Sequence, residues 1–323
     1  MYTDDFMTYI ATFRRYSTRT QEIYSEILKE FTDYCGADSD RSILESLVPS
    51  VVRSYEVHLM EERKLDPRTV NLHLSVLSGF CRFLMKSGAL KVNPVRSVHR
   101  PKVEKRLPVF YREESMTEYF RITECNASEE NLQMVTGNDR TSAGFLSRRL
   151  SRLIVSMLFS TGIRRSELIG IDVRDVDFSR KVLRVRGKGD KEREIPLVSA
   201  LCKEILLYLK AVETFEGRAR LADEPLLQTL AGRRLYPVFV DRVIKSELGQ
   251  IGSITGRKSP HVLRHSLATD LLNEGTDLNS IKELLGHSSL AATQVYTHNS
   301  IEKLKNVYVN AHPRAKSGGK NGD

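Results

Sequence analysis

The sequence predicts a mainly α-helical protein with a small β-sheet, built as an N-terminal helical bundle followed by a mixed α/β domain. Three observations support this prediction. Residues 1–92 show helical spacing of apolar side chains, residues 93–108 form a break rich in proline and basic residues, and residues 181–197 contain two short β-rich runs around glycines. Amphipathic helices must bury their apolar stripes against neighbours, so the regions before and after the break should each form a core.

Four short helices are expected in residues 1–92. Helix starts are indicated by the possible caps in 17–20, by Pro49 and by Asp66-Pro67, while Gly36 and Gly88 are placed to end helices. The apolar stripe of the second helix is Ile23, Ile27, Phe31 and Tyr34, and that of the fourth is Val70, Leu74, Leu77, Phe80 and Leu84. The expected helices therefore cover residues 4–15, about 20–36, 49–65 and 67–88.

Residues 93–108 are expected to be an extended linker between the two domains. The segment NPVRSVHRPKVEKRLP has three prolines, five Lys and Arg residues and one acid, Glu104. Proline and charge favour an extended, solvated chain. Sixteen residues can span roughly 50 Å, which exceeds the width of a DNA duplex, so the linker could let two domains bind opposite faces of DNA. A plain tether is the alternative.

Residues 109–310 are expected to form the second domain, and residues 311–323 a C-terminal tail that is disordered after Lys316. Glycines between two β-rich runs indicate a hairpin turn. Segment 124–145 is polar and is expected to be an irregular loop insertion. The expected strands are 181–186 and 193–197, and the expected helices are 113–123, 146–160, 199–214, 237–249, 261–274, 278–286 and 290–308.

Charge points to a polyanionic partner. The chain of 323 residues has a net charge of +9, of which residues 1–100 contribute +1 and the remainder +8. Four scattered cysteines suit a reducing cytosol. No apolar run of 18 residues and no basic N-terminal leader occur, so neither a membrane span nor a signal peptide is expected.

Two basic motifs lie at predicted helix boundaries. Arg164 follows Gly162 in TGIRRSEL, and Glu167 comes three residues later. In PHVLRH, His261 and Arg264 are three residues apart on a helix that Pro260 can start, so they share a face. A helix N-terminus favours an anion, and arginine fits phosphate oxygens bidentately. Each motif by itself also fits an ordinary basic surface.

Two further segments contain residues that suit phosphate chemistry. Lys188 lies in the glycine turn GKGDKER, and His287 ends the segment LLGH. Tyr296 follows nine residues after His287, about two turns into a predicted helix. A single tyrosine on a helix most often belongs to the core, so Tyr296 indicates a catalytic role only in combination with the other residues.

As a set, these residues resemble the catalytic residues of the tyrosine recombinases, a phage-integrase-like family, and the chain is most similar to its Xer branch. Six positions match in type and order: Arg164, Lys188, His261, Arg264, His287 and Tyr296. The resemblance covers the whole chain, and the segment Ala311–Lys316 (AHPRAK) is similar to the end of Xer proteins. Segment 124–145 is longer than is usual in the branch.

The resemblance implies a role for each residue. Tyr296 would attack a DNA phosphate, with His261 as its base and Lys188 as the acid that protonates the leaving 5′-oxygen. Arg164 and Arg264 would neutralise the phosphate, and His287 would add a hydrogen bond. Glu167 would hold this group of residues in place, although an acid at a helix N-terminus is an equally good explanation.

The resemblance also implies partners: a double-stranded DNA recombination site, and a homo- or heterotetramer on DNA with a second Xer-like recombinase and a septal DNA translocase. Cleavage and rejoining through a 3′-phosphotyrosine and a Holliday junction, resolving chromosome dimers in the cytoplasm at the nucleoid, is the expected function. No metal or other cofactor is expected, because the sequence has neither clustered carboxylates with metal spacing nor a GxxxxGK[ST] loop.

Three alternatives stay open on these residues. A mobile-element integrase or DNA invertase shares all six, and a type IB topoisomerase shares the tyrosine chemistry without partner exchange. A DNA-binding protein with a dead active site is the third, although its expected losses, Tyr296 or either arginine, have not occurred. Residues 301–316 carry an apolar stripe, and the resemblance implies that this terminal helix packs into a neighbouring subunit. Packing in cis, as part of the domain's own core, is the alternative.

Overall fold

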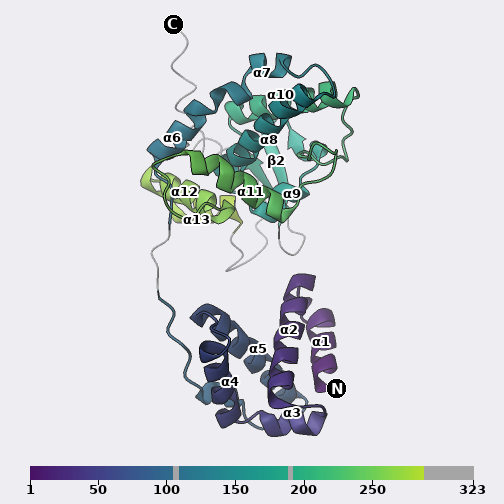
Figure 1. Cartoon of the computed structure of the whole chain (residues 1–323), viewed down its shortest axis with the longest axis vertical. Coiled ribbons are helices and arrows are strands. Elements are labelled where there is room, and N and C mark those ends of the chain that lie inside the picture. Colours follow the sequence, from purple (N-terminus) through teal and green to yellow (C-terminus); the bar gives the residue numbers. More distant parts are fainter. Residues whose placement is uncertain (105–108, 188–191, 287–323) are drawn as a thin grey trace. The chain divides into compact units, whose positions relative to one another are not determined.

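The computed structural model describes residues 1–104, 109–187 and 192–286 (Figure 1). Contacts divide the chain into two compact units, with the division between residues 106 and 107. Each unit has its own hydrophobic core. The predicted fold class, mainly α with a small β-sheet, is confirmed.

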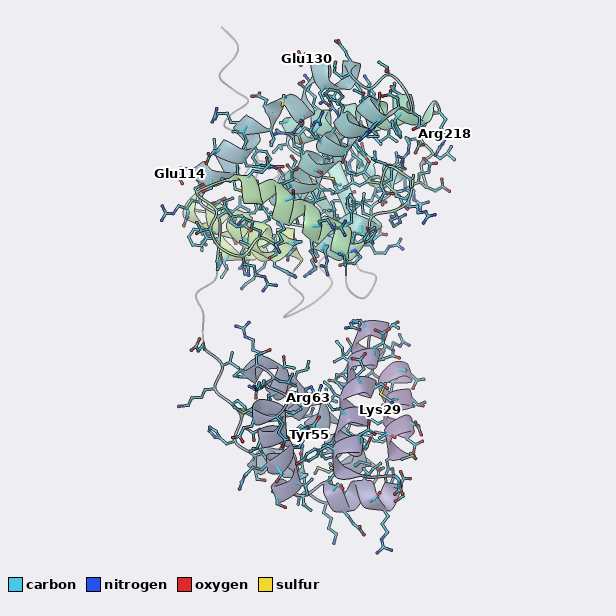
Figure 2. The ribbon with its side chains drawn as sticks, in the orientation of Figure 1. Lys29, Tyr55, Arg63, Glu114, Glu130 and Arg218 are labelled. Atoms are coloured by element: carbon cyan, nitrogen blue, oxygen red, sulfur yellow. The ribbon has the colours of Figure 1, made fainter. Side chains whose placement is uncertain are left out.

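The first unit is a helical bundle around an aromatic core. Phe31, Tyr55 and Phe80 are each at most 1% exposed, and Figure 2 shows Tyr55 inside the bundle. The Tyr55 hydroxyl lies 3.0 Å from Nδ1 of His73, which satisfies both polar groups within the core. Within residues 1–104 the helices are α1 (Tyr2–Thr12), α2 (Thr18–Cys35), α3 (Asp40–Ser46), α4 (Pro49–Glu61), α5 (Pro67–Lys86) and the 3₁₀ helix η1 (Pro94–Ser97).

Two elements of this unit differ from the prediction. Helix α3 was not expected, because seven residues are too few to show a helical period, yet Ser39 caps it and Ile43 is fully buried. Helix η1 occupies the start of the predicted linker, and its Val95 packs in the first core with Val98. The prediction of an extended chain from residue 93 is therefore wrong for 94–97, because burial of Pro94 and Val95 holds this segment as a 3₁₀ helix against the bundle.

The second unit surrounds a long central helix, α8, against which α10, α11 and α12 pack (Figure 1). From residue 109 to residue 286, outside the gap at 188–191, the structure gives these elements: α6 (Glu113–Ile122), η2 (Glu124–Ala127), α7 (Glu129–Gln133), α8 (Arg140–Thr161), α9 (Arg165–Gly170), η3 (Val173–Asp175), β1 (Val176–Asp177), β2 (Val182–Arg186), β3 (Glu192–Pro196), α10 (Ser199–Glu216), α11 (Pro237–Glu247), η4 (Leu248–Gln250), α12 (Pro260–Asn273) and α13 (Leu278–Leu285).

The sheet is antiparallel, in the order β1-β2-β3. The expected hairpin pairs in a register that places Val185 opposite Arg193 and Leu183 opposite Ile195. Leu183 and Ile195 are fully buried, so one face of the hairpin contributes to the core. Strand β1 has two residues and was too short to be predicted from the sequence.

Segment 124–145 is not an irregular loop, and that prediction is wrong. It contains η2, α7 and the first turn of α8, which begins six residues earlier than expected. Asp139 caps this start by accepting hydrogen bonds from the backbone N–H groups of Thr141 (2.8 Å) and Ser142 (3.0 Å). The buried Arg149 of α8 then donates to Asn131 Oδ1 and to the Ser128 carbonyl, which fixes α7 against the core.

The remaining helices of the second unit agree with the prediction within two residues at either end, apart from α9, which was expected only as a start near Ser166. The expected helix 290–308 and the tail 311–323 lie outside the described residues. In the described part of the chain, none of the helices is long and apolar enough to cross a membrane.

Candidate active site

A glycine turn at the end of α8 sets the direction of the chain into the site. Gly162 caps α8 in the left-handed conformation, with φ of 62°. A Cβ atom here would lie 2.6 Å from Cδ2 of Leu285 and 3.0 Å from Cδ2 of Leu267, so the position excludes a side chain on grounds of both backbone and space. The tight turn brings α8, α12 and α13 together and places Arg164 at the start of α9.

Arg164 is held on two sides. Its backbone N–H donates to Glu167 Oε2 (2.8 Å) and its Nη1 to Glu167 Oε1 (2.7 Å). Its Nη2 donates to the carbonyl of Gly286, at 2.9 Å. The side chain remains 33% exposed, so the guanidinium is fixed in place while one side stays open to solvent.

Helix α12 supplies the second arginine. Arg264 donates from Nη1 to the Gly162 carbonyl (2.6 Å) and from Nη2 to the Leu285 carbonyl (2.5 Å). Burial, followed by the charge of Arg164, lowers the pKa of Arg264 to about 10. Arg264 therefore remains a cation at neutral pH, and it shares the site with a second positive charge.

His261 starts the same helix, one turn before Arg264, and its side chain is exposed. Partial desolvation lowers the pKa of His261, and the charges of Arg165 and Arg257 lower it further. The neutral imidazole is thereby favoured at neutral pH. A neutral imidazole at this place can accept a proton from a reacting group or donate a hydrogen bond to one.

Glu167 lies at the centre of the site and pairs with two arginines. Besides Arg164, it accepts hydrogen bonds from Arg193 Nη1 on Oε1 (3.0 Å) and from Arg193 Nη2 on Oε2 (2.9 Å). Burial alone would raise the pKa of Glu167, but the hydrogen bonds from Arg193 and Arg164 and the charge of Arg193 hold it at about 2. Glu167 is therefore an anion throughout the physiological range.

Three arginines bind the C-terminal end of α13. The carbonyls of Leu284, Leu285 and Gly286 accept hydrogen bonds from Arg193, Arg264 and Arg164, respectively. The last carbonyls of a helix have no partner within the helix and carry partial negative charge. Each successive carbonyl at this end is thus satisfied by a different guanidinium.

The charges of the site do not balance. The three guanidinium groups carry three positive charges, whereas Glu167 carries one negative charge and the end of α13 about half a charge more. The excess is positive and lies beside the exposed parts of Arg164 and His261. Such an arrangement attracts an anion with several oxygen acceptors, as in a phosphodiester.

A cleft of about 600 Å³ opens beside this group of residues. Helix α9 contributes Ser166, Glu167 and Gly170 to its lining, and strand β2 contributes Arg184 and Arg186. Within the residues that the structure describes, no group of three or more His, Cys, Asp or Glu residues is arranged to hold a metal ion.

Four of the seven predicted residues fall within the described ranges. The structure brings Arg164, Glu167, His261 and Arg264 into one site, from the starts of α9 and α12. The predicted Lys188, His287 and Tyr296 lie outside the described residues.

One residue of the site, Arg193, was missed. A signal was present, because the strand EREIP alternates and Arg193 falls at an inward position of the buried face, opposite Val185. A charged residue at an inward strand position requires a buried partner of opposite charge. That partner, Glu167, is 26 residues away in the chain, which the pattern of the strand could not indicate.

Both units of the chain are similar in sequence to known proteins. The profile of the phage integrase family matches residues 133–303, and that of the phage integrase N-terminal SAM-like domain matches residues 3–87. The tyrosine recombinase XerC of Chlorobaculum parvum is 32% identical over 325 residues, covering 97% of this chain and 94% of the relative. The tyrosine recombinase XerC of Bacillus subtilis is 34% identical over 317 residues, covering 96% and 95%.

A solved structure shares the fold. The XerH site-specific recombinase, bound to palindromic difH substrate in a post-cleavage complex, has a TM-score of 0.63 and 16% identity to this chain. The likeness covers 95% of this chain and 81% of that one. At this identity the likeness concerns the fold alone.

Proposed function

The chain belongs to the phage integrase family and is a site-specific tyrosine recombinase, and on this premise we propose that it exchanges DNA strands through a covalent bond between Tyr296 and a DNA phosphate. The observation that carries the proposal is the site with excess positive charge, in which Arg164 and Arg264 are fixed by the end of α13 and His261 stands exposed beside them. A phosphodiester supplies the missing negative charge.

The proposed cleavage step transfers the DNA phosphoryl group from the 5′-oxygen to Tyr296. The Tyr296 oxygen attacks phosphorus and loses its proton to His261, whose lowered pKa keeps it neutral and able to accept. The bond from phosphorus to the 5′-oxygen breaks, and Lys188 gives that oxygen a proton. The product is a 3′-phosphotyrosine and a free 5′-hydroxyl. Arg164 and Arg264, with a hydrogen bond from His287, stabilise the charge that develops on the phosphate oxygens.

Rejoining is the same step in reverse with another strand. The 5′-hydroxyl of a partner duplex attacks the phosphotyrosine, so the phosphodiester energy is kept and no nucleotide is hydrolysed. Exchange of one strand pair gives a Holliday junction, and exchange of the second resolves it. We infer that the DNA is a recombination site, since the XerH recombinase is bound to a difH substrate. We also infer that the biological outcome is resolution of chromosome dimers at the nucleoid, as the resemblance to the Xer branch implies.

The working assembly we propose is a homo- or heterotetramer on DNA, with a second Xer-like recombinase and a septal DNA translocase as its partners. The two-unit architecture supports binding of DNA by both units, joined by the chain between them. Residues 301–316, which we propose to pack into the neighbouring subunit of that tetramer, lie outside the described residues.

Trapping on DNA tests the function. A duplex recombination site with a nick close to the cleavage point loses its short 5′-hydroxyl fragment after cleavage, so the covalent adduct accumulates. We expect an adduct with the full chain, and no adduct with Tyr296→Phe, which removes one oxygen and leaves DNA binding intact in a mobility-shift assay. An adduct that survives this change would move the nucleophile elsewhere.

Two controls belong to the same assay. Cleavage should continue in EDTA, because the proposed charge neutralisation comes from side chains. Recombination of two sites should occur with little relaxation of a supercoiled plasmid that lacks a site, whereas a type IB topoisomerase would relax it. Loss of the adduct in EDTA with recovery in magnesium would overturn the mechanism.

A further inference from the structure

The structure assigns Arg193 a positioning role in the reaction, resting on the proposed function: it holds Glu167, and through it Arg164, in the geometry that binds the phosphate. Arg193 is 8% exposed and belongs to β3, at the edge of the site. Its side chain is too enclosed to reach a DNA strand. It therefore acts through its neighbours.

The contacts of Arg193 use three of its donors in a single plane. Nη1 and Nη2 reach the two oxygens of Glu167, and Nε reaches the Leu284 carbonyl at 3.2 Å. A planar fork can satisfy a carboxylate and a carbonyl together, whereas the ammonium of a lysine is a point charge and cannot keep all three bonds.

Glu167 transmits this constraint to Arg164. Each oxygen of Glu167 accepts one hydrogen bond from Arg193 and one from Arg164, so the carboxylate cannot rotate without losing contacts to both. Arg164 is the partly exposed arginine of the site and, in the proposed mechanism, contacts the phosphate. A shift of the carboxylate therefore shifts the group that binds the substrate.

The end of α13 is the second structure that Arg193 fixes. Besides the bond to Leu284, the guanidinium packs against Gly286, where an added Cβ would lie 3.2 Å from Nε, Cζ and Nη1. Gly286 has φ of 65° and its carbonyl accepts from Arg164. Arg193 thus supports Arg164 from both directions, through Glu167 and through the backbone at Gly286.

The same unit contains a matched control. Arg152 is also buried and also pairs with a glutamate, with Nη2 at 3.1 Å from Glu204 Oε1. The other donors of Arg152 go to the Phe120 carbonyl and to Thr123, neither of which belongs to the site. Arg152→Lys and Arg193→Lys disturb comparable buried ion pairs, and in the second the glutamate is the partner of Arg164.

The test compares cleavage of a normal phosphodiester with cleavage of a methylphosphonate, in which a methyl group replaces one non-bridging oxygen and removes the charge. If Arg193 acts by placing Arg164 on the charged oxygens, Arg193→Lys should cleave the phosphodiester about 10- to 100-fold more slowly. On the methylphosphonate the deficit relative to the unsubstituted chain should shrink by most of that factor, because less charge needs neutralising.

Arg152→Lys should lower the melting temperature but keep the ratio of the two cleavage rates. If Arg193→Lys is slow on both substrates by the same factor, or is as fast as the unsubstituted chain, the positioning role is overturned. Should Arg193→Lys fail to fold, the double substitution Arg193→Gln with Glu167→Gln leaves no unpaired buried ion, and the same change in the ratio of the two rates is expected. Failure of the proposed function is distinguishable, since it would appear as no adduct with the unsubstituted chain.

Discussion

Two buried Arg–Glu pairs in the described part of the second unit look alike in composition but differ in the residues that they contact. Arg152 and Glu204 are 5% and 7% exposed, and Arg193 and Glu167 are 8% and 5% exposed. Arg152 ties α8 to α10 and to the segment before η2. The Arg193 pair continues instead to Arg164, whose side chain is one-third exposed.

This difference shows that burial of an ion pair is a poor guide to function. Replacing such a pair by apolar residues is often neutral, whereas removing one partner is costly, so both pairs look equally important in a test of stability alone. What marks the second pair is its continuation to an exposed cation and an excess of positive charge. The first unit gives a further contrast, because within residues 1–104 the buried polar residues His73, Ser78 and Asn93 include no Asp, Glu, Lys or Arg.

Alanine substitutions of Arg164, to which the Arg193 pair connects, and of Arg152 should give the largest difference between loss of cleavage and loss of stability. Arg164→Ala removes a direct phosphate contact in the proposed mechanism and should slow adduct formation by about 10²- to 10³-fold. Its effect on stability should be small, because Glu167 keeps Arg193 as a partner. Arg152→Ala should cost about 3–5 kcal/mol of unfolding free energy, while its folded fraction cleaves at the normal rate. Single-turnover cleavage and denaturant unfolding measure the two effects, and equal losses of both in each variant would erase the distinction.

The charge of Glu167 should appear in the pH dependence of stability. The pKa of Glu167 is about 2 in the folded chain, below its ordinary 4.5, so its contribution is fully present above pH 4.5 and is lost as the pH falls toward 2. The difference corresponds to on the order of 3 kcal/mol. Between pH 5 and pH 2, the unsubstituted chain should therefore lose about that much more stability than Glu167→Gln. Parallel stability curves for the two proteins would contradict the assignment of Glu167 as a buried anion.

Two glycines allow the cost of backbone strain to be separated from the cost of steric overlap, and here the expected effects are smaller. Gly162 and Gly217 both end long helices in the left-handed conformation, but a Cβ at Gly217 would meet nothing within 4 Å. Gly217→Ala should cost only the backbone strain, about 1–2 kcal/mol. Gly162→Ala should cost about 1–3 kcal/mol more because of its contacts with Leu285 and Leu267, and it should slow cleavage because the Gly162 carbonyl anchors Arg264. Thermal unfolding and the trapping assay measure both, and equal effects of the two substitutions would show that the space at Gly162 is not limiting.

The sequence indicated where the helices of the site begin but did not by itself single out the site residues. Gly162 and Pro260 indicated the helix boundaries beside Arg164 and His261, and helical spacing placed His261 and Arg264 on one face. Each motif alone also fitted an ordinary basic surface, and the site was predicted from the resemblance of the whole set to the tyrosine recombinases. Arg193 could not be assigned in this way, since its partner Glu167 becomes a neighbour only when the hairpin packs beside α9. The capping of α13 by three arginines is equally a product of tertiary packing.

The errors in the predicted fold have two causes, short elements and misleading composition. Helix α3, strand β1 and helix η1 are each seven residues or shorter, so a periodic pattern has too few positions to be recognised. In segment 124–145, polar composition suggested a loop, but Asp139 caps α8 and the buried Arg149 holds the segment from inside. Polar residues there satisfy each other's hydrogen bonds, which composition alone does not indicate.

Three backbone carbonyls at the end of α13 accept hydrogen bonds from the arginines of the site, so the last turn of that helix is bound to the site. Because two of these guanidinium groups, those of Arg164 and Arg264, are proposed to hold the DNA phosphate, the free energy of ordering that turn and the free energy of binding phosphate are thermodynamically linked. The linkage is reciprocal: if bound phosphate strengthens the hold on Leu284–Gly286 tenfold, the ordered turn binds phosphate tenfold more tightly, a coupling of about 1.4 kcal/mol. DNA binding should therefore be readable, without any cleavage, from the hydrogen-exchange rates of the amides at the end of α13.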